Sequence, residues 1–156
     1  MKLAISTVLA AVALAGCATH GSQSGRTNGY PAQGLFINGN LDSLVKEFEQ
    51  LCPSFDDSHV EVSNTSRVVC SRTLTGWEAS VAHFKIGNKY SKTPKRKVHF
   101  YMTKRDNGVY VKIYDTTETD TKYGQHRELQ MNSRSDVRKM ENLLTSMGAV
   151  LAEDEE

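Results

Sequence analysis

The stretch that decides the fold is residues 97–117, KVHFYMTKRDNGVYVKIYDTT, in which apolar and polar side chains alternate on both sides of a short polar interruption. Period-two alternation is typical of strands with one buried face. The interruption Asp106-Asn107-Gly108 predicts a tight turn, because Asn-Gly tolerates the positive φ angles that a type I′ hairpin needs. The stretch therefore predicts two antiparallel strands, 97–105 and 109–117. Their apolar face consists of Val98, Phe100, Met102, Val109, Val111 and Ile113.

Amphipathic helices are predicted on both sides of this hairpin. On the N-terminal side, Asn40 is suited to cap a helix that stops before Pro53. On the C-terminal side, Ser133 or Ser135 is suited to cap a helix that ends at Gly148. The apolar residues at helical spacing are Leu41, Leu44, Val45, Phe48 and Leu51 in the first helix, and Val137, Met140, Leu143, Leu144 and Met147 in the second.

Shorter runs with strand character, 59–63, 67–74 and 79–86, lie between the first helix and the hairpin. We therefore expect an α+β fold, with about five antiparallel strands and the N-terminal and C-terminal helices packed on one face of the sheet. Trp77 is expected to fill the core near a turn, and His99 to face solvent on its strand. The single domain is placed at residues 35–150, followed by a short acidic tail at 151–156.

The first 17 residues have the organisation of an export signal. Lys2 precedes an uncharged apolar run, residues 3–15, which is shorter than the roughly 20 residues of a membrane-spanning helix. The run ends in Leu-Ala-Gly-Cys at residues 14–17, and this segment resembles the lipobox of bacterial lipoprotein precursors. The resemblance covers these residues alone. It implies removal of residues 1–16 and attachment of lipid, including a fatty acid such as palmitate, to Cys17. A conventional signal peptide with an incidental cysteine is the alternative.

Residues 17–34 are rich in Gly, Ser, Asn and Gln, a composition typical of a flexible tether. Two or more acyl chains hold a protein stably on a bilayer, so we expect an anchored protein and not a spanning one. If the resemblance extends to lipoprotein sorting of the enterobacterial type, Ala18 instead of Asp after the lipidated cysteine implies the outer membrane. The expected orientation faces the periplasm, and exposure on the cell surface is the alternative.

The two other cysteines, Cys52 and Cys70, are predicted to form a structural disulfide. An even pair in an oxidising compartment is bonded by default. Two free thiols or a redox pair are the alternatives, and the spacing does not match the C-x-x-C redox motif.

Motifs for catalysis or for cofactor and metal binding are not recognisable in the sequence. It has no zinc-ligand spacing, no G-x-S-x-G, no phosphate-binding loop and no dinucleotide-binding fingerprint. Asp56-Asp57 follows Pro53 closely and is interpreted as turn chemistry. Without Lys2 the chain has 18 basic and 18 acidic residues, so its net charge gives no argument for nucleic acid as a partner. We therefore expect no enzyme activity, no cofactor, no metal and no nucleic acid.

The charges are nevertheless segregated. Residues 79–105 contain no acidic residue, and we expect their densest part to be an exposed basic loop that contacts an acidic protein surface or an anionic lipid. A solvated loop without a partner is the alternative. A stripe of tyrosines, 101, 110 and 114, is a second candidate surface, although tyrosine is also an ordinary strand residue. The residues assigned to the basic loop are Lys85, Lys89, Lys92, Lys95, Arg96 and Lys97.

Together these features predict an envelope lipoprotein that is a non-catalytic accessory or binding module for a protein partner, in an assembly, secretion or conjugation machine. A binder of small ligands or glycans, or an inhibitor of a foreign enzyme such as a lysozyme, is the alternative. A hydrolase with an unrecognised site is the third hypothesis.

Overall fold

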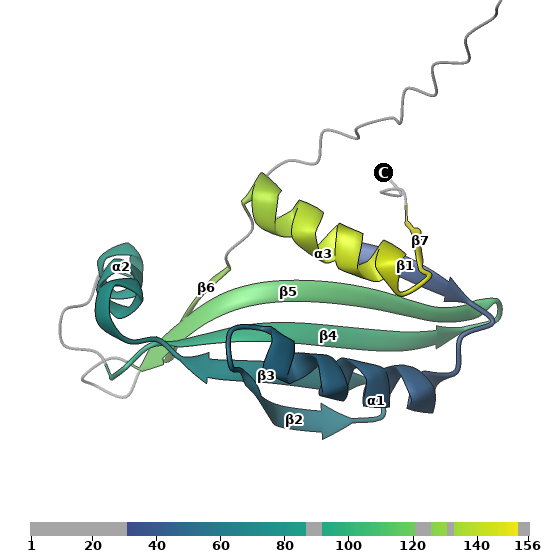
Figure 1. The fold of residues 1–156 in the computed structure, drawn as a ribbon, viewed down its shortest axis with the longest axis horizontal. Coiled ribbons are helices and arrows are strands. Elements are labelled where there is room, and N and C mark those ends of the chain that lie inside the picture. The colour runs from purple at the N-terminus through teal and green to yellow at the C-terminus, as the bar shows by residue number, and fades with distance from the viewer. Residues whose placement is uncertain (1–30, 87–91, 121–125, 131–132, 153–156) are drawn as a thin grey trace, which may run out of the picture.

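The structure is a computed structural model that describes residues 31–86, 92–120, 126–130 and 133–152. Within these ranges the chain forms a seven-stranded antiparallel sheet with three α-helices, which confirms the α+β class (Figure 1). Cys17, the export signal and nearly all of the tether lie outside the described residues. The elements are β1 (Ala32–Ile37), α1 (Leu41–Leu51), a 3-10 turn (Cys52–Ser54), β2 (His59–Asn64), β3 (Arg67–Thr73), α2 (Gly76–Ile86), β4 (Lys95–Arg105), β5 (Gly108–Asp120), β6 (His126–Gln130), α3 (Arg134–Ser146) and β7 (Val150–Leu151).

The predicted hairpin forms the middle of the sheet as β4 and β5. The strand order is β2-β3-β4-β5-β1-β7, with β6 also paired to β5. The N-terminal half of β5 pairs with β1 and its C-terminal half with β6, so two short strands share one long edge. β1, β6 and β7 were not predicted from the sequence, because none of them shows a long alternating pattern.

The hairpin turn differs from the expected type I′ turn. Arg105 pairs with Gly108, which makes Asp106 and Asn107 the central residues, and neither has a positive φ. Gly108 instead is the first residue of β5, with a φ of 150°. A Cβ atom there would lie 2.0 Å from the carbonyl oxygen of Phe36. Glycine is therefore required by the close approach of β1 and by its own backbone conformation.

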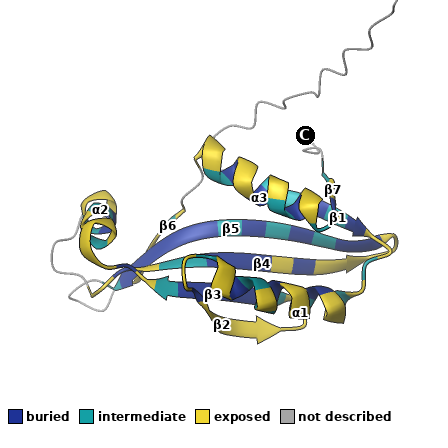
Figure 2. Ribbon diagram, viewed as in Figure 1, coloured by how far each residue is buried: buried dark blue, intermediate teal, exposed yellow. Residues whose placement is uncertain are grey.

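The main core lies between the sheet and the two predicted helices, α1 and α3, which cover the same face (Figure 1). Phe48 of α1 is fully buried and stacks on Phe100 of β4, with ring centroids 4.4 Å apart. Both predicted caps are present: Asn40 accepts a hydrogen bond from the Ser43 amide, and Ser133 accepts one from the Asp136 amide. The two helices are buried toward the sheet and exposed outward (Figure 2).

The predicted disulfide between Cys52 and Cys70 is confirmed, with Cα atoms 5.1 Å apart. It joins the C-terminal end of α1 to β3, and both cysteines are fully buried. Closing a loop of this length stabilises a domain by about 3 kcal/mol in the chain-entropy model. Asp56 and Asp57 both have positive φ angles, as expected of a turn.

Three other expectations are wrong. Residues 79–86 belong to α2 and not to a strand, and Trp77 on the same helix is 79% exposed instead of buried. His99 does lie on the side of β4 opposite Val98, but it is only 4% exposed because neighbouring side chains cover it. Separately from these three, β1 starts at Ala32, before the expected start of the domain at residue 35, and the side chain of Ala32 is buried. None of the described helices is long and apolar enough to cross a membrane.

Candidate functional site

The six cations expected to form one basic loop are spread over several surfaces. Lys89 lies outside the described residues. Lys85 is in the last turn of α2, and Lys92 precedes β4, where it is exposed and lies 3.5 Å from Asp120. The remaining three, Lys95–Lys97, are the first residues of β4, so their side chains alternate between the two faces of the sheet.

Arg96 and Lys97 are both paired with carboxylates of other strands of the sheet. Arg96 donates two hydrogen bonds from Nε and one from Nη2 to Asp115, at 2.5–3.1 Å, and Asp115 is 3% exposed. This contact raises the pKa of Arg96 above its ordinary value. On the other face, Lys97 Nζ lies 3.0 Å from Glu61 and 2.6 Å from Glu118. Of the described loop cations, Lys85, Lys92 and Lys95 are therefore the ones exposed to a partner.

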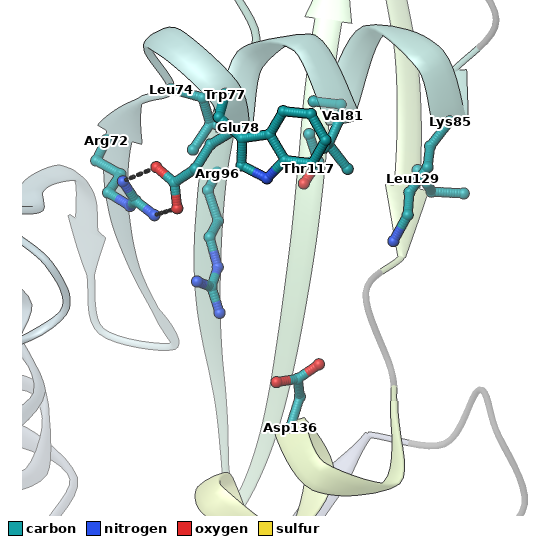
Figure 3. Close-up of a pocket in the computed structure, with 11 residues that line it drawn as sticks. Arg72, Leu74, Trp77, Glu78, Val81, Lys85, Arg96, Thr117, Leu129 and Asp136 are labelled. Atoms are coloured by element: carbon teal, nitrogen blue, oxygen red, sulfur yellow. Dashed lines mark hydrogen bonds and ion pairs between the residues drawn. The ribbon is translucent and has the colours of Figure 1, made fainter.

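A hollow of about 240 Å³, the α2 cleft, lies between α2, the sheet and the N-terminal end of α3 (Figure 3). Figure 3 shows Trp77 and Val81 on the α2 side of the cleft and Asp136 of α3 on the opposite side. The cleft is on the same face of the sheet as the main core but beyond its end. Its lining residues are Arg72, Leu74, Trp77, Glu78, Val81, Ala82, Lys85, Arg96, Thr117, Leu129 and Asp136.

Polar contacts hold both ends of α2 against the sheet. At its start, Arg72 of β3 donates two hydrogen bonds to Glu78, each of 2.8 Å, and these lower the pKa of Glu78. At its end, Arg127 of β6 donates to the carbonyl oxygen of Ile86 at 3.3 Å. Ala82 and Ile86 are buried, but neither belongs to the main core. The helix is thus fixed in place while most of its surface stays exposed (Figure 2).

The exposed side of α2 carries two large aromatic side chains. Trp77 is 79% exposed and Phe84 is 87% exposed. Together with Val81 they follow the i, i+4, i+7 spacing of one helix face. The same spacing in the sequence could have identified the helix, but the apolar run between residues 79 and 86 is short enough to fit either structure. Exposed apolar patches of this kind mark interaction sites in soluble domains.

The second candidate surface, the open face, is the side of the sheet opposite α1 and α3. The strand alternation places the three tyrosines of the predicted stripe, 101, 110 and 114, on this face. The rings of Tyr101 and Tyr114 meet edge to face at 5.6 Å. They border a hollow of about 520 Å³. Its lining residues are His99, Tyr101, Thr103, Lys112, Tyr114, Thr116, Glu128 and Gln130.

His99 lies at the bottom of this hollow as a neutral imidazole. Burial, reinforced by the positive charge of Arg67, lowers its pKa to about 4. Arg67 Nη2 donates to Nδ1 at 2.9 Å, so the ring proton must be on Nε2, which lies 2.9 Å from Thr116 Oγ1. In this tautomer His99 donates to the threonine hydroxyl, and it cannot take the hydroxyl proton as a general base.

His99, Glu118 and Glu128 are the described residues best placed to hold a metal, since one ligand atom from each lies within 4.8 Å of the others. However, the Nδ1 lone pair of His99 is used by Arg67, and Glu118 is engaged by Lys97 at 2.6 Å. The arrangement therefore does not favour a cation at this point.

Lowering the pH should destabilise the protein through His99. The unfolded chain takes up this proton near pH 6.5 and the folded chain only near pH 4, so the stability is fully present above pH 6.5 and falls as the pH approaches 4. Between pH 7 and 4.5, the wild type should lose roughly 2 kcal/mol more than His99→Gln, measured by urea unfolding. Glu61 and Glu118 are acidic residues that act on the imidazole. Because the wild type and the variant both contain them, their contribution cancels in the comparison. Equal losses of stability in the two proteins would contradict this prediction, because they would mean that the pKa of His99 is the same in the folded and the unfolded chain.

No protein-family model, curated protein or solved structure matches this chain.

Proposed function

We propose that this chain is an outer-membrane lipoprotein, anchored through Cys17, that acts as a non-catalytic binding module for a protein partner of the envelope, and that α2 makes the contact. The observation that carries the proposal is the exposure of Trp77 and Phe84 on a helix that is fixed at both ends. Without a bound partner, the apolar surface of Trp77 and Phe84 stays in contact with water, which is unfavourable.

The surroundings of α2 suit a protein interface. Exposed tryptophans are among the side chains that contribute most to binding when they enter a partner's pocket. The α2 cleft, with Leu74 and Leu129 in its lining, has a volume of about 240 Å³ and could receive an apolar side chain in return. Lys85 in the cleft and Lys92 at the same end of the sheet would steer an acidic partner.

The anchor and the tether support the same proposal. The segment that ends at Cys17 carries the lipobox resemblance, and residues 18–30 have the composition of a tether that would hold the domain near a bilayer. A partner in an assembly, secretion or conjugation machine would be met at that surface.

The test replaces both aromatic side chains of α2 in the full-length protein. Trp77→Ala with Phe84→Ala should reduce recovery of the partner from cross-linked, detergent-solubilised membranes by roughly 30-fold or more, since the loss of even one interface anchor costs about 2 kcal/mol. The thermal unfolding midpoint should change little, because both side chains are exposed.

The matched control is Ile37→Ala, which also shortens an exposed apolar side chain but lies at the Gly108 end of the sheet. It should leave recovery unchanged. Equal recovery by the α2 variant and the wild type would refute the proposal. So would a photo-reactive side chain at position 77 that labels lipid and no protein.

A further inference from the structure

We propose that the open face is a binding site for an acidic oligosaccharide, with a sugar ring against Tyr101 and the ligand's carboxylate between Arg67 and Lys112. This site is on the opposite side of the sheet from the α2 cleft. It is independent of the proposed protein contact.

The charges of the open face are the first support. Three of the cations on the sheet have carboxylate partners: Arg72 with Glu78, Arg96 with Asp115, and Lys97 with Glu61 and Glu118. By contrast, in the described part of the chain no carboxylate oxygen lies within 4.0 Å of the charged nitrogens of Arg67 or Lys112. Two neighbouring cations without counter-charges favour an anionic ligand.

These two cations flank one aromatic ring. In the sheet register, Arg67 of β3 is opposite Tyr101 of β4, which in turn is opposite Lys112 of β5. The Arg67 guanidinium lies over the Tyr101 ring, 5.0 Å from its centroid. Its Nε atom is buried and has no hydrogen-bond partner among the described residues. A carboxylate bound beside this guanidinium would offset its positive charge.

His99 keeps the charge of Arg67 uncompensated. Their hydrogen bond joins Nη2 to Nδ1 at 2.9 Å, and an imidazole whose pKa is lowered to about 4 is neutral at pH 7. The imidazole ring lies parallel to the Tyr101 ring, with centroids 6.1 Å apart. The histidine therefore fixes the positions of the arginine and the tyrosine without reducing the positive charge.

The remaining features select a sugar over a simple anion. Tyr101 is 38% exposed and braced by Tyr114, so it offers a fixed aromatic surface for the apolar side of a sugar ring. Glu128 and Gln130, both exposed, line the same hollow and can bond to hydroxyl groups. A densely charged polyanion would be repelled by Glu128. The volume of about 520 Å³ is within the range of small-ligand sites.

The experiment compares two disaccharides that differ in one group. Cellobiouronate carries one carboxylate, and cellobiose has the same two rings without it. In an NMR titration of the protein at low salt, cellobiouronate should shift the amides of β4 and β5 around Tyr101 and saturate. Cellobiose should bind about ten-fold more weakly, the loss expected for one charge-assisted contact. Acetate, which has the charge without the ring, should not saturate.

Matched variants locate the site. Lys112→Met and Arg67→Met should each weaken cellobiouronate binding about ten-fold, whereas Lys104→Met removes the same charge on the other side of β4 and should have no effect. If Arg67→Met fails to fold because His99 loses its hydrogen-bond partner, the binding measurement on Lys112→Met alone tests the site. Equal binding of the two disaccharides, equal losses in Lys104→Met and Lys112→Met, or no saturable shifts would each overturn the proposal. Shifts confined to α2 would do so as well, and they would leave the protein-binding proposal to its own test.

Discussion

Cys17→Ser is expected to abolish the lipid attachment of the protein to the membrane. Serine has no sulfur to form the thioether with diacylglycerol, so neither that lipid nor the later amino-terminal fatty acid should be attached. Each buried methylene contributes roughly 0.8 kcal/mol, and stable attachment requires two or more acyl chains. After cell fractionation, the wild type should be in the membrane pellet and carry a palmitate label, whereas the variant should carry no label. We expect the variant to be unprocessed or processed at another site.

Cys70→Ser is the matched control, because it makes the same chemical change at a cysteine that forms the disulfide with Cys52. It should weaken the fold but retain the lipid label. Equal labelling of wild type and Cys17→Ser would mean that residues 1–16 are an ordinary signal peptide and that Cys17 is incidental.

The parts of the fold that were predicted from the sequence share one physical property: a long regular pattern that only one structure satisfies. The alternation in residues 97–117 fits strands alone, and it correctly paired the faces of β4 and β5. The caps at Asn40 and Ser133 combine with apolar stripes of three turns, and both helices were placed within two residues. The disulfide was predicted from the expected oxidising compartment and from the even number of cysteines left after Cys17, not from geometry.

The parts that were missed depend on tertiary contacts. β1 and β7 are short strands that exist because β1 pairs with β5 and β7 pairs with β1. β1 begins at Ala32, before the expected start of the domain at residue 35, because nothing local marks Ala32 as a strand residue. Most of α2 was interpreted as a strand because its own apolar residues are distributed around the whole helix. The helical period is therefore weak in the sequence.

The candidate sites were predicted in part, for the same reason. Alternation correctly placed Tyr101, Tyr110 and Tyr114 on one face. No local pattern could show that His99 lies beneath Arg67, because these residues are 32 positions apart. Charge counting likewise grouped Arg96 with the exposed lysines, since partners such as Asp115 are distant in the sequence.

Arg96→Met is therefore expected to act on stability and not on binding alone. Asp115 is 3% exposed, and removing Arg96 leaves its carboxylate buried without the guanidinium that accounts for its three close contacts. Breaking a buried ion pair from one side destabilises proteins by roughly 3–5 kcal/mol. Because Arg96 is partly exposed, we expect a loss of about 3 kcal/mol in the free energy of unfolding, measured in urea at pH 7.

Two further variants separate the buried charge from the general effect of removing a cation. Lys92→Met breaks an exposed pair with Asp120 and should leave the free energy of unfolding almost unchanged. Adding Asp115→Asn to Arg96→Met removes the orphaned charge, so the double variant should be more stable than Arg96→Met alone. If Arg96→Met lost no more than Lys92→Met, Asp115 would not depend on Arg96. Arg96 would then return to the group of cations available for a partner, beside Lys85 in the α2 cleft.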